Sequence, residues 1–361
     1  MSHTPSSSPT VGKPFDSRHN SLNLIRLCLA LLVLFAHTYF LIGQPTGPTY
    51  GGLHGGEWAV AAFFALSGYL IAGSAMRHAT GTYLLNRAAR IIPGYYVCLV
   101  IMVTVFAPIT YLSENGTLSG YLTTATTPFN YLLENMLFRG PLYPIAETPA
   151  HIPWPYAWNG SLWTLYFELI CYVVMAVMCQ FAVVKKSPWP MLLMFLGSVW
   201  VYANSATIGV YFESSYVFSS LSKLLPLFLG GALVCVVGEW VGMHRWFGIG
   251  STLAALALMK FIPLWGGQLA APLLAYALLW ISSWLPQPRF VRDNDLSYGT
   301  YVYAFPVQQL LAVFGLSALS SWMFTVIAAA VTLPMAYLSW RHVEQPMMSR
   351  ARGLSAGAAP G

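Results

Sequence analysis

An arginine and a histidine stand eleven residues apart in the first long apolar segment, SLNLIRLCLALLVLFAHTYFLIG. In an α-helix, eleven residues make about three turns, so Arg26 and His37 share one face, about 16 Å apart along the axis. An ionisable group inside a membrane span is costly and indicates a functional site. We therefore expect a fixed cation near one membrane surface and a titratable base deeper on the same stripe.

A carboxylate in the fourth apolar segment is expected at the depth of His37. Glu168 lies about six residues from the outer end of its predicted span and His37 about five, which places both roughly 8–9 Å below the surface. Glu168 could orient His37 and raise its basicity, as carboxylates do in catalytic triads. The alternative is a structural contact of Glu168 with a tyrosine, a tryptophan or a backbone donor, because a buried carboxylate needs a partner.

Two further arginines, Arg87 and Arg90, precede the third segment in NRAARIIPGYY. Residues three apart share a helix face, and paired guanidinium forks suit phosphate. Ordinary anchoring at a cytoplasmic surface is the alternative. Together with Arg26 they would put three cations at one surface, which suits a polyphosphate ligand such as a nucleotide or coenzyme A.

Several polar residues fall inside predicted spans, in FFALSGYLI, SLWTLYFELICY and LSYGTYVYAFPVQQLL. They indicate a hydrated cavity, although small residues such as those of the SG pair also permit close helix packing. The candidate substrate-binding residues are Ser67, Tyr69, Trp163, Tyr301 and Gln308.

The composition indicates a polytopic, all-α membrane protein. The chain has 361 residues, 57% hydrophobic and only 8% charged, whereas soluble domains are about 25% charged. We predict a bundle of about ten transmembrane helices, each long enough for a bilayer core of roughly 30 Å. The predicted spans are 22–42, 58–76, 93–112, 161–182, 188–205, 219–238, 246–262, 268–284, 296–316 and 321–340.

The basic residues set the predicted orientation. With the N-terminus inside, fourteen of the 17 Lys and Arg residues fall on the inner side, so both termini are expected in the cytoplasm. The net charge of +6 forms no patch, and no nucleic-acid partner is expected. The segment 1–20 is predicted to be a disordered tail, 21–346 the transmembrane domain, and 347–361 a flexible tail.

The five cysteines lie within apolar segments without a CxxC pair, so we expect them to be small hydrophobic side chains and to form neither a disulfide nor a metal site. The loop at about 113–160 is predicted to be external. Its aromatic end, HIPWPYAWNGSLW, is typical of an interfacial belt or, alternatively, of a platform for sugar rings. A short helix is predicted at 131–138.

Six motifs in order resemble the membrane-bound acyltransferase family 3, which includes bacterial O-antigen and exopolysaccharide O-acetyltransferases. NLIRLCLALLVLFAH is similar to the R-x10-H first helix of that family, and FFALSGYLI and NRAARIIPGYY are similar to its next two motifs. SLWTLYFELICY, LSYGTYVYAFP and the closing VEQP resemble the remaining three. The likeness extends from about residue 20 to 346.

The resemblance implies ten helices, an acyl-CoA donor on the cytoplasmic side and an acceptor at the outer face. It also implies that His37, Arg26, Arg87 and Arg90 are functionally essential. Many members carry a ninth-helix histidine where this chain has Ala304. A role of that histidine is absent here or is taken over by Gln308 or Gln309.

The resulting hypothesis is an acyl-CoA-dependent O-acetyltransferase in the bacterial inner membrane. The arginines would hold the coenzyme phosphates, and His37, oriented by Glu168, would act as general base on a glycan hydroxyl. A covalent acyl-histidine is a variant of this mechanism. The expected partners are membrane lipid, acetyl-CoA or another acyl-CoA, and a glycan, with no metal.

Two other classes compete with this hypothesis. A transporter or flippase for a glycan or lipid would also have a polar, aromatic cavity, but it would need no phosphate cluster facing the cytoplasm. A regulatory or scaffolding protein leaves the buried histidine and glutamate unexplained. The sequence leaves the acceptor, the acyl group and the oligomeric state open.

Overall fold

The computed structural model describes residues 13–17, 19–44, 47–213 and 215–357. It divides into two compact units. Unit 1 comprises Met1–Ile25, Ala61–Ala79 and Val173–Gln287, and unit 2 comprises Arg26–Val60, Thr80–Tyr172 and Pro288–Gly361. Most of the tail predicted at 1–20 lies outside the described residues.

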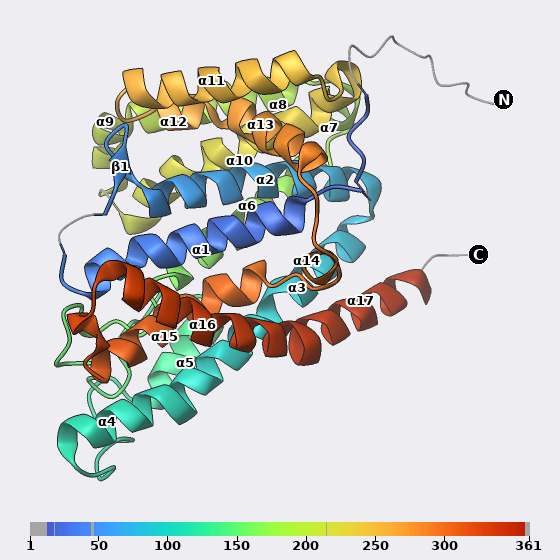
Figure 1. Ribbon diagram of the computed structural model, residues 1–361. Coiled ribbons are helices and arrows are strands. Elements are labelled where there is room, and N and C mark those ends of the chain that lie inside the picture. The colour runs from blue at the N-terminus through green and yellow to red at the C-terminus, as the bar shows by residue number, and fades with distance from the viewer. Residues whose placement is uncertain (1–12, 18, 45–46, 214, 358–361) are drawn as a thin grey trace. The chain divides into compact units, whose positions relative to one another are not determined.

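Apart from one short hairpin and two isolated β-bridges, the regular secondary structure of the described chain is helical, which confirms the all-α class (Figure 1). Three helices belong to both units: α1 (Leu22–Leu41), α2 (Gly55–Arg77) and α6 (Leu162–Met178). Unit 1 also holds α7 (Ala182–Lys186), α8 (Trp189–Ala203), α9 (Ser205–Gly209), η2 (Val210–Phe212), α10 (Tyr216–Val241), α11 (Arg245–Phe261), α12 (Gly266–Leu269) and α13 (Ala271–Trp284). Unit 2 also holds β1 (Thr49–Tyr50), β2 (Leu53–His54), α3 (Thr80–Ile101), η1 (Met102–Phe106), α4 (Ala107–Asn115), α5 (Pro128–Met136), α14 (Arg289–Asp293), α15 (Ser297–Val313), η3 (Leu316–Ala318), α16 (Ser321–Ser339), η4 (Trp340–Glu344) and α17 (Gln345–Gly357).

In unit 1, α10 packs against α8, α12 and α13. It also crosses α2 at very short range. A Cβ atom added to Gly68 would lie 1.8 Å from the carbonyl oxygen of Phe228, and one added to Gly231 would lie 1.8 Å from that of Ala65. Glycine is therefore required at both positions, as in close helix crossings within membranes.

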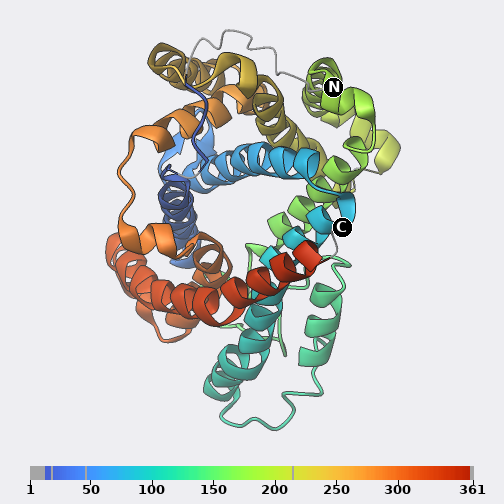
Figure 2. The same ribbon diagram turned by 90° about the vertical axis from the view of Figure 1, so that its right-hand side faces the viewer.

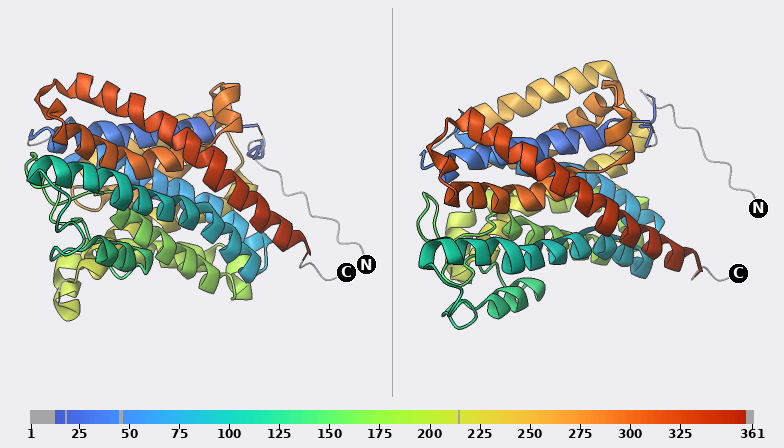
Figure 3. Two further views of the ribbon diagram at one scale, coloured as in Figure 1. Left: turned by 90° about the horizontal axis from the view of Figure 1, so that it is seen from below. Right: turned by 60° about the horizontal axis from the view of Figure 1, so that its bottom comes forward.

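In unit 2, α15 packs beside α16, and α3 packs beside η4 and α17. Two long continuous rods shape this unit. Figure 2 shows α3 running through η1 into α4, and Figure 3 shows α16 running through η4 into α17. Both rods contain a π-helical turn, η1 and η4. Such turns are rare in proteins, and those that occur often lie at functional sites.

Helices occupy all ten segments in which the sequence predicted spans. Within the described residues, five are long and apolar enough to cross a membrane: Leu22–Leu41, Gly55–Arg77, Thr80–Asn115, Tyr216–Gly238 and Ser321–Ser355. A sixth candidate is the pair Trp189–Ala203 and Ser205–Phe212, which is bent by 76°. The others are 17 residues or shorter, and 17 residues span only about 26 Å. A multi-pass membrane protein is therefore supported, while ten crossings stay a prediction.

All five cysteines are free, and three of them are buried. The helix predicted at 131–138 is α5, whose first turn is capped by Thr127, since its hydroxyl accepts from Asn130 N. Helix α17 continues to Gly357, where the sequence predicted a flexible tail from residue 347.

Candidate functional site

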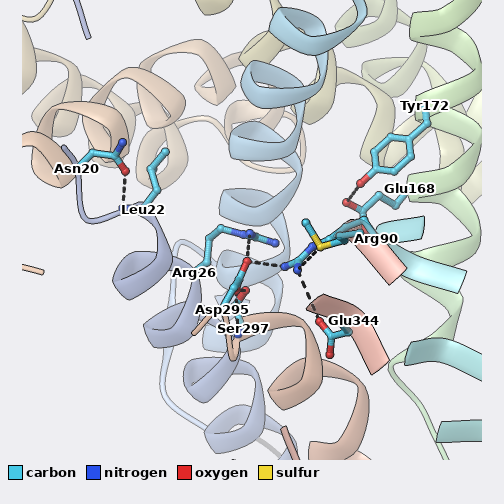
Figure 4. Close-up of polar contacts among 10 residues, drawn as sticks. Asn20, Leu22, Arg26, Arg90, Glu168, Tyr172, Asp295, Ser297 and Glu344 are labelled. Atoms are coloured by element: carbon cyan, nitrogen blue, oxygen red, sulfur yellow. Dashed lines mark hydrogen bonds and ion pairs between the residues drawn. The ribbon is translucent and has the colours of Figure 1, made fainter. Parts of the chain in front are cut away.

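Two of the three arginines converge on one aspartate in unit 2 (Figure 4). Arg26 Nη1 donates to Asp295 Oδ2 at 2.9 Å, and Arg90 Nη2 donates to the same oxygen at 2.5 Å. The other oxygen, Oδ1, accepts from the backbone and hydroxyl of Ser297 at 3.2 and 2.6 Å. The carboxylate thus joins the start of α15 to both α1 and α3.

The charge state of Asp295 follows from these contacts. Burial alone would raise the pKa of the Asp295 carboxyl. The guanidinium groups of Arg90 and Arg26, together with the hydrogen bonds from Ser297, outweigh burial and hold that pKa well below its usual range. Asp295 is therefore an anion at neutral pH.

Arg90 contacts a second carboxylate, Glu344, which lies in the π-helical turn η4. Arg90 Nη1 is 3.6 Å from Glu344 Oε2, and Ser339 donates to Oε1 at 2.9 Å. The guanidinium also lies over the rings of Tyr298 and Trp340, at 5.8 and 5.5 Å from their centroids. These contacts fix Arg90 from three sides.

Gly94, one turn after Arg90, makes this arrangement possible. A Cβ atom at this position would lie 2.8 Å from the ring of Tyr298 and 3.3 Å from the Glu344 side chain. The glycine of NRAARIIPGYY therefore lets α3 approach α15 and η4 closely enough for the ion pair to form.

Arg87 differs from the other two arginines. Its Nε atom is buried and has no hydrogen-bond partner. It lies near Tyr172, with which it interacts electrostatically. Arg26 and Arg90 contact two carboxylates, Asp295 and Glu344, so that the cluster is less cationic than the sequence predicted.

Glu168 lies in the same part of unit 2 as Arg26 and Arg90 (Figure 4). Its Oε1 atom accepts a hydrogen bond from the hydroxyl of Tyr172 at 2.6 Å, one turn further along α6. The Nδ1 atom of His37 is buried and has no hydrogen-bond partner. The structure therefore shows the tyrosine contact that the sequence left open as the alternative, and no bond from His37 Nδ1 to Glu168.

His37 lies near the opposite end of α1 from Arg26 and is half-buried. Its ring meets the edge of Phe305 from α15, with centroids 5.1 Å apart. One turn further along α15, Gln308 donates from Nε2 to Leu34 O at 3.0 Å and to Thr38 Oγ1 at 2.9 Å. Gln308 thus binds α15 to the helical turns that carry His37.

A buried polar contact joins α15 to α6 and the residue before it. The Tyr301 hydroxyl bonds with the hydroxyl of Thr164 and also donates to Ser161 O at 3.5 Å. Trp163 is half-buried and packs on Phe167, with centroids 6.1 Å apart. Ala304 lies in an apolar cluster with Leu34 and Ala328.

Ser67 and Tyr69 lie in unit 1 and flank the close crossing at Gly68. Tyr69 meets the ring of Phe15 edge-on, with centroids 5.9 Å apart. Gly68 therefore serves close helix packing, which is the alternative that the sequence left open for this motif. Binding of a substrate by Ser67 and Tyr69 stays a prediction.

Sequence reasoning did not select Asp295, Glu344, His54 or Glu57. A signal was present for the first two, because arginines inside spans require counter-charges and few carboxylates exist near the predicted inner surface. His54 and Glu57 form a contact of 3.6 Å between Nε2 and Oε2. Within the described residues, no group of three His, Cys, Asp or Glu side chains could hold a metal ion.

Comparison with known proteins places this sequence in a family. The profile of acyltransferase family 3, described as an acyltransferase domain, matches residues 19–341. The chain is 27% identical to an O-acetyl transferase of Shigella phage Sf6, covering 92% of this chain and 97% of the relative. It is 26% identical to Nodulation protein 10 of Rhizobium leguminosarum bv. viciae, covering 94% and 96%. No solved structure matches.

The family match spans the arginine cluster, His37 and nearly all of the helices described above. Membership of this family explains why a membrane protein carries ionisable residues inside apolar helices. The chain therefore belongs to the membrane-bound acyltransferase family 3.

Proposed function

We propose that the protein is an O-acetyltransferase of the bacterial inner membrane that uses cytoplasmic acetyl-CoA. Its acceptor is a hydroxyl of an envelope or exported polysaccharide at the outer face. The observation that carries the proposal is the arrangement along α1, where Arg26 and His37 lie about 16 Å apart within one unit. An orphaned buried nitrogen is present both in the arginine cluster and at His37, namely Arg87 Nε and His37 Nδ1.

The arginine cluster provides the donor site in this proposal. A guanidinium has five N–H donors, and the contacts of Arg26 and Arg90 with Asp295 and Glu344 use only some of them. Arg87 brings a buried donor without a partner. Phosphate oxygens of acetyl-CoA accept these hydrogen bonds, which are strong because both partners are charged. The pantetheine arm then extends along unit 2 toward His37.

His37 carries the chemical step. Its neutral imidazole removes the proton of the acceptor hydroxyl while the hydroxyl oxygen bonds to the thioester carbonyl carbon. The tetrahedral intermediate then collapses, the carbon–sulfur bond breaks, and the coenzyme thiolate takes the proton back from His37. The products are the acetyl ester and free coenzyme A, and the histidine is regenerated. No protein group bonds to the Nδ1 atom of His37, so we take this atom as the proton acceptor.

The acyl group is proposed from similarity, and the acceptor from the residues near His37. The relative from phage Sf6 is named an O-acetyl transferase, so acetyl is the group that we propose. An exported polysaccharide fits the exposed aromatic residues near His37, among them Trp154, which suit the faces of sugar rings.

The test uses purified protein in lipid nanodiscs with acetyl-CoA labelled in the acetyl group. The acceptor is oligosaccharide released from the envelope polysaccharide of the producing cell. We expect label in the oligosaccharide with wild-type protein and a loss of about 100-fold or more with His37→Ala, as for a general base. His19→Ala is the matched control because it removes an exposed imidazole of unit 1.

Two results would contradict the proposal. Turnover of His37→Ala near that of wild type would remove His37 from the chemistry. Movement of unmodified glycan across proteoliposomes without label in any product would identify a transporter instead. Mass spectrometry of envelope glycans from cells with and without the protein tests the same point in vivo, through loss of an acetyl increment.

A further inference from the structure

A polar and aromatic cluster lies beside His37 and has no role in the chemistry described above. It consists of His54, Glu57, Phe40 and Trp154, all in unit 2, and is called the His54 cluster below. We infer that the His54 cluster is the acceptor subsite, where a neutral sugar ring binds with one hydroxyl directed at His37. This inference rests on the proposed function and names the residues that recognise its acceptor.

A hairpin and a helix start hold the two polar members in place. β1 and β2 pair in register Thr49↔His54 and Tyr50↔Leu53. The turn between them is Gly51-Gly52, with φ values of 58° and 80°, and glycine readily adopts such angles. His54 ends β2, and α2 begins at the next residue, so Glu57 lies in the first turn of that helix.

The aromatic members extend from His54 across the end of α1. The ring centroid of His54 is 5.3 Å from that of Phe40, which is 5.9 Å from that of Trp154. Gln309 of α15 fixes the Trp154 loop, because its Nε2 atom donates to Trp154 O at 2.9 Å. The four side chains thus form one continuous surface from three separate parts of the chain.

The cluster lies next to the proposed base. Phe40 is one turn from His37 on the same face of α1, and His54 is close enough to His37 for an electrostatic interaction. A Cβ atom on Gly56 would lie 3.2 Å from Ala36 Cβ and 3.5 Å from His54 Nδ1. The start of α2 therefore rests directly on the helical turn that carries His37.

The cluster is open to a ligand and has polar atoms that a ligand can satisfy. The side chains of His54 and Glu57 are 31% and 26% exposed, and Trp154 is 47% exposed. The Nδ1 atom of His54 is buried without a hydrogen-bond partner. Buried polar atoms are nearly always bonded in proteins, and a ligand hydroxyl can both donate and accept.

The chemistry of the cluster selects a neutral polyhydroxyl ligand. A sugar ring stacks its C–H face on an aromatic ring, as Phe40 and Trp154 allow, while its hydroxyl groups donate to the Glu57 carboxylate. An anionic ligand would be repelled by Glu57. A purely apolar ligand would leave the buried Nδ1 atom of His54 without a hydrogen bond, at a cost. A few polar groups within an aromatic lining are typical of ligand sites.

The test measures two Michaelis constants with the labelled donor and the envelope oligosaccharide of the preceding experiment. We expect His54→Ala and Glu57→Ala to raise the KM for the oligosaccharide about tenfold, as expected for loss of one hydrogen bond to a charged group. The KM for acetyl-CoA should stay at the wild-type value. Glu57→Gln, which keeps an accepting oxygen, should recover part of the loss.

Two exposed side chains of the loop 113–160 serve as matched controls. His151→Ala and Glu134→Ala remove a histidine and a glutamate that lie outside the cluster, and both Michaelis constants should stay at wild-type values. Trp154→Ala is a further variant for the case that His54→Ala fails to fold, because Trp154 is about half exposed. It too should raise only the KM for the oligosaccharide.

The outcomes separate this inference from the proposed function. If wild-type protein labels the oligosaccharide and the Glu57→Ala and Trp154→Ala variants keep its KM, the subsite is wrong and the enzyme assignment stands. A parallel rise in the KM for acetyl-CoA also overturns the subsite, because it indicates a general distortion. If wild-type protein transfers no label at all, the proposed function itself fails.

Discussion

Arg87 and Arg90 lie one helical turn apart on α3, yet they have different surroundings. Arg90 faces two carboxylates and its side chain is 11% exposed. Arg87 has a buried Nε atom without a partner, and leaving such a donor unpaired is costly. Arg87 is therefore the arginine that we expect to bind phosphate most directly, whereas Arg90 holds three elements of unit 2 together.

Substitution of Arg87 should weaken donor binding while leaving the fold intact. We expect Arg87→Ala to raise the KM for acetyl-CoA by about tenfold or more, as for a lost charge-assisted hydrogen bond of about 1.5–3 kcal/mol. Arg87→Lys should recover only part, because lysine keeps the charge but not the planar fork. Arg292→Ala, which removes an exposed arginine paired with Asp293, should have no effect. An unchanged KM in Arg87→Ala would leave that residue as a helix anchor.

Asp295 should stabilise the fold independently of pH across the physiological range. Its folded pKa is lowered from 3.8, so its contribution is complete above about pH 4 and is lost only as the pH falls further. We expect Asp295→Asn to lower the thermal unfolding temperature by the same amount at pH 5.5 and pH 8. A stabilising contribution that appeared only above pH 7 would show that Asp295 is protonated in the folded protein at pH 5.5.

The sequence identified the arginines but not their partners. Arg26, Arg87 and Arg90 stand out because each is a rare charge near or within an apolar segment. Asp295 is 205 residues from Arg90 along the chain, and Glu344 belongs to the π-helical turn η4. The predicted depth of Glu168 in the membrane did not identify its partner either. Tyr172, one turn further along the same helix, donates a hydrogen bond to it. Contacts of this kind depend on how helices approach one another.

At the scale of elements, the approach of α3 to α15 depends on one glycine. We expect Gly94→Ala to lower the free energy of unfolding by about 1–3 kcal/mol, because the added methyl group overlaps Tyr298 and crowds Glu344. Gly81→Ala is the matched control in the same helix, since a Cβ atom there meets nothing within 4 Å. It should be neutral or stabilising by about 0.5–1 kcal/mol. Chemical denaturation in detergent measures both, and equal stability of the two variants would contradict the close contact.

Hydropathy located the helices well but not their interruptions. Each predicted span contains an observed helix, because apolar runs bounded by Pro, Gly and charged residues are visible in sequence. The 76° bend between α8 and α9 was not visible, although it follows Asn204, whose side chain donates to Trp200 O at 2.8 Å. The π-helical turns were also missed. A hydropathy window sums composition and is insensitive to the direction in which the backbone turns.

At the scale of the whole molecule, the number of crossings decides which residues share a membrane face. The prediction that His54 and Glu134 lie outside and Arg87 lies inside follows from the distribution of Lys and Arg residues. Helices α11 and α13 have 17 and 14 residues, and both are shorter than the roughly 20 residues that a membrane-spanning helix needs. If both cross, the segment between them lies outside. If neither does, that segment lies inside together with the loop after α10.

Leu264 tests this point, because it lies between α11 and α13 and is 87% exposed. In intact cells, a membrane-impermeant maleimide should label Leu264→Cys and Glu134→Cys but not Lys186→Cys. Permeabilised cells should allow labelling of Lys186→Cys as well. Wild-type protein measures the background from the native cysteines, three of which are buried.

Labelling of Leu264→Cys only after permeabilisation would reduce the number of crossings by two. Loss of both the α11 and the α13 crossing leaves the orientation of the other helices unchanged. The predicted outer position of the His54 cluster and the predicted inner position of Arg87 would therefore still hold. Labelling of Lys186→Cys in intact cells would instead reverse the expected orientation of that loop, and with it the separation of donor and acceptor sides.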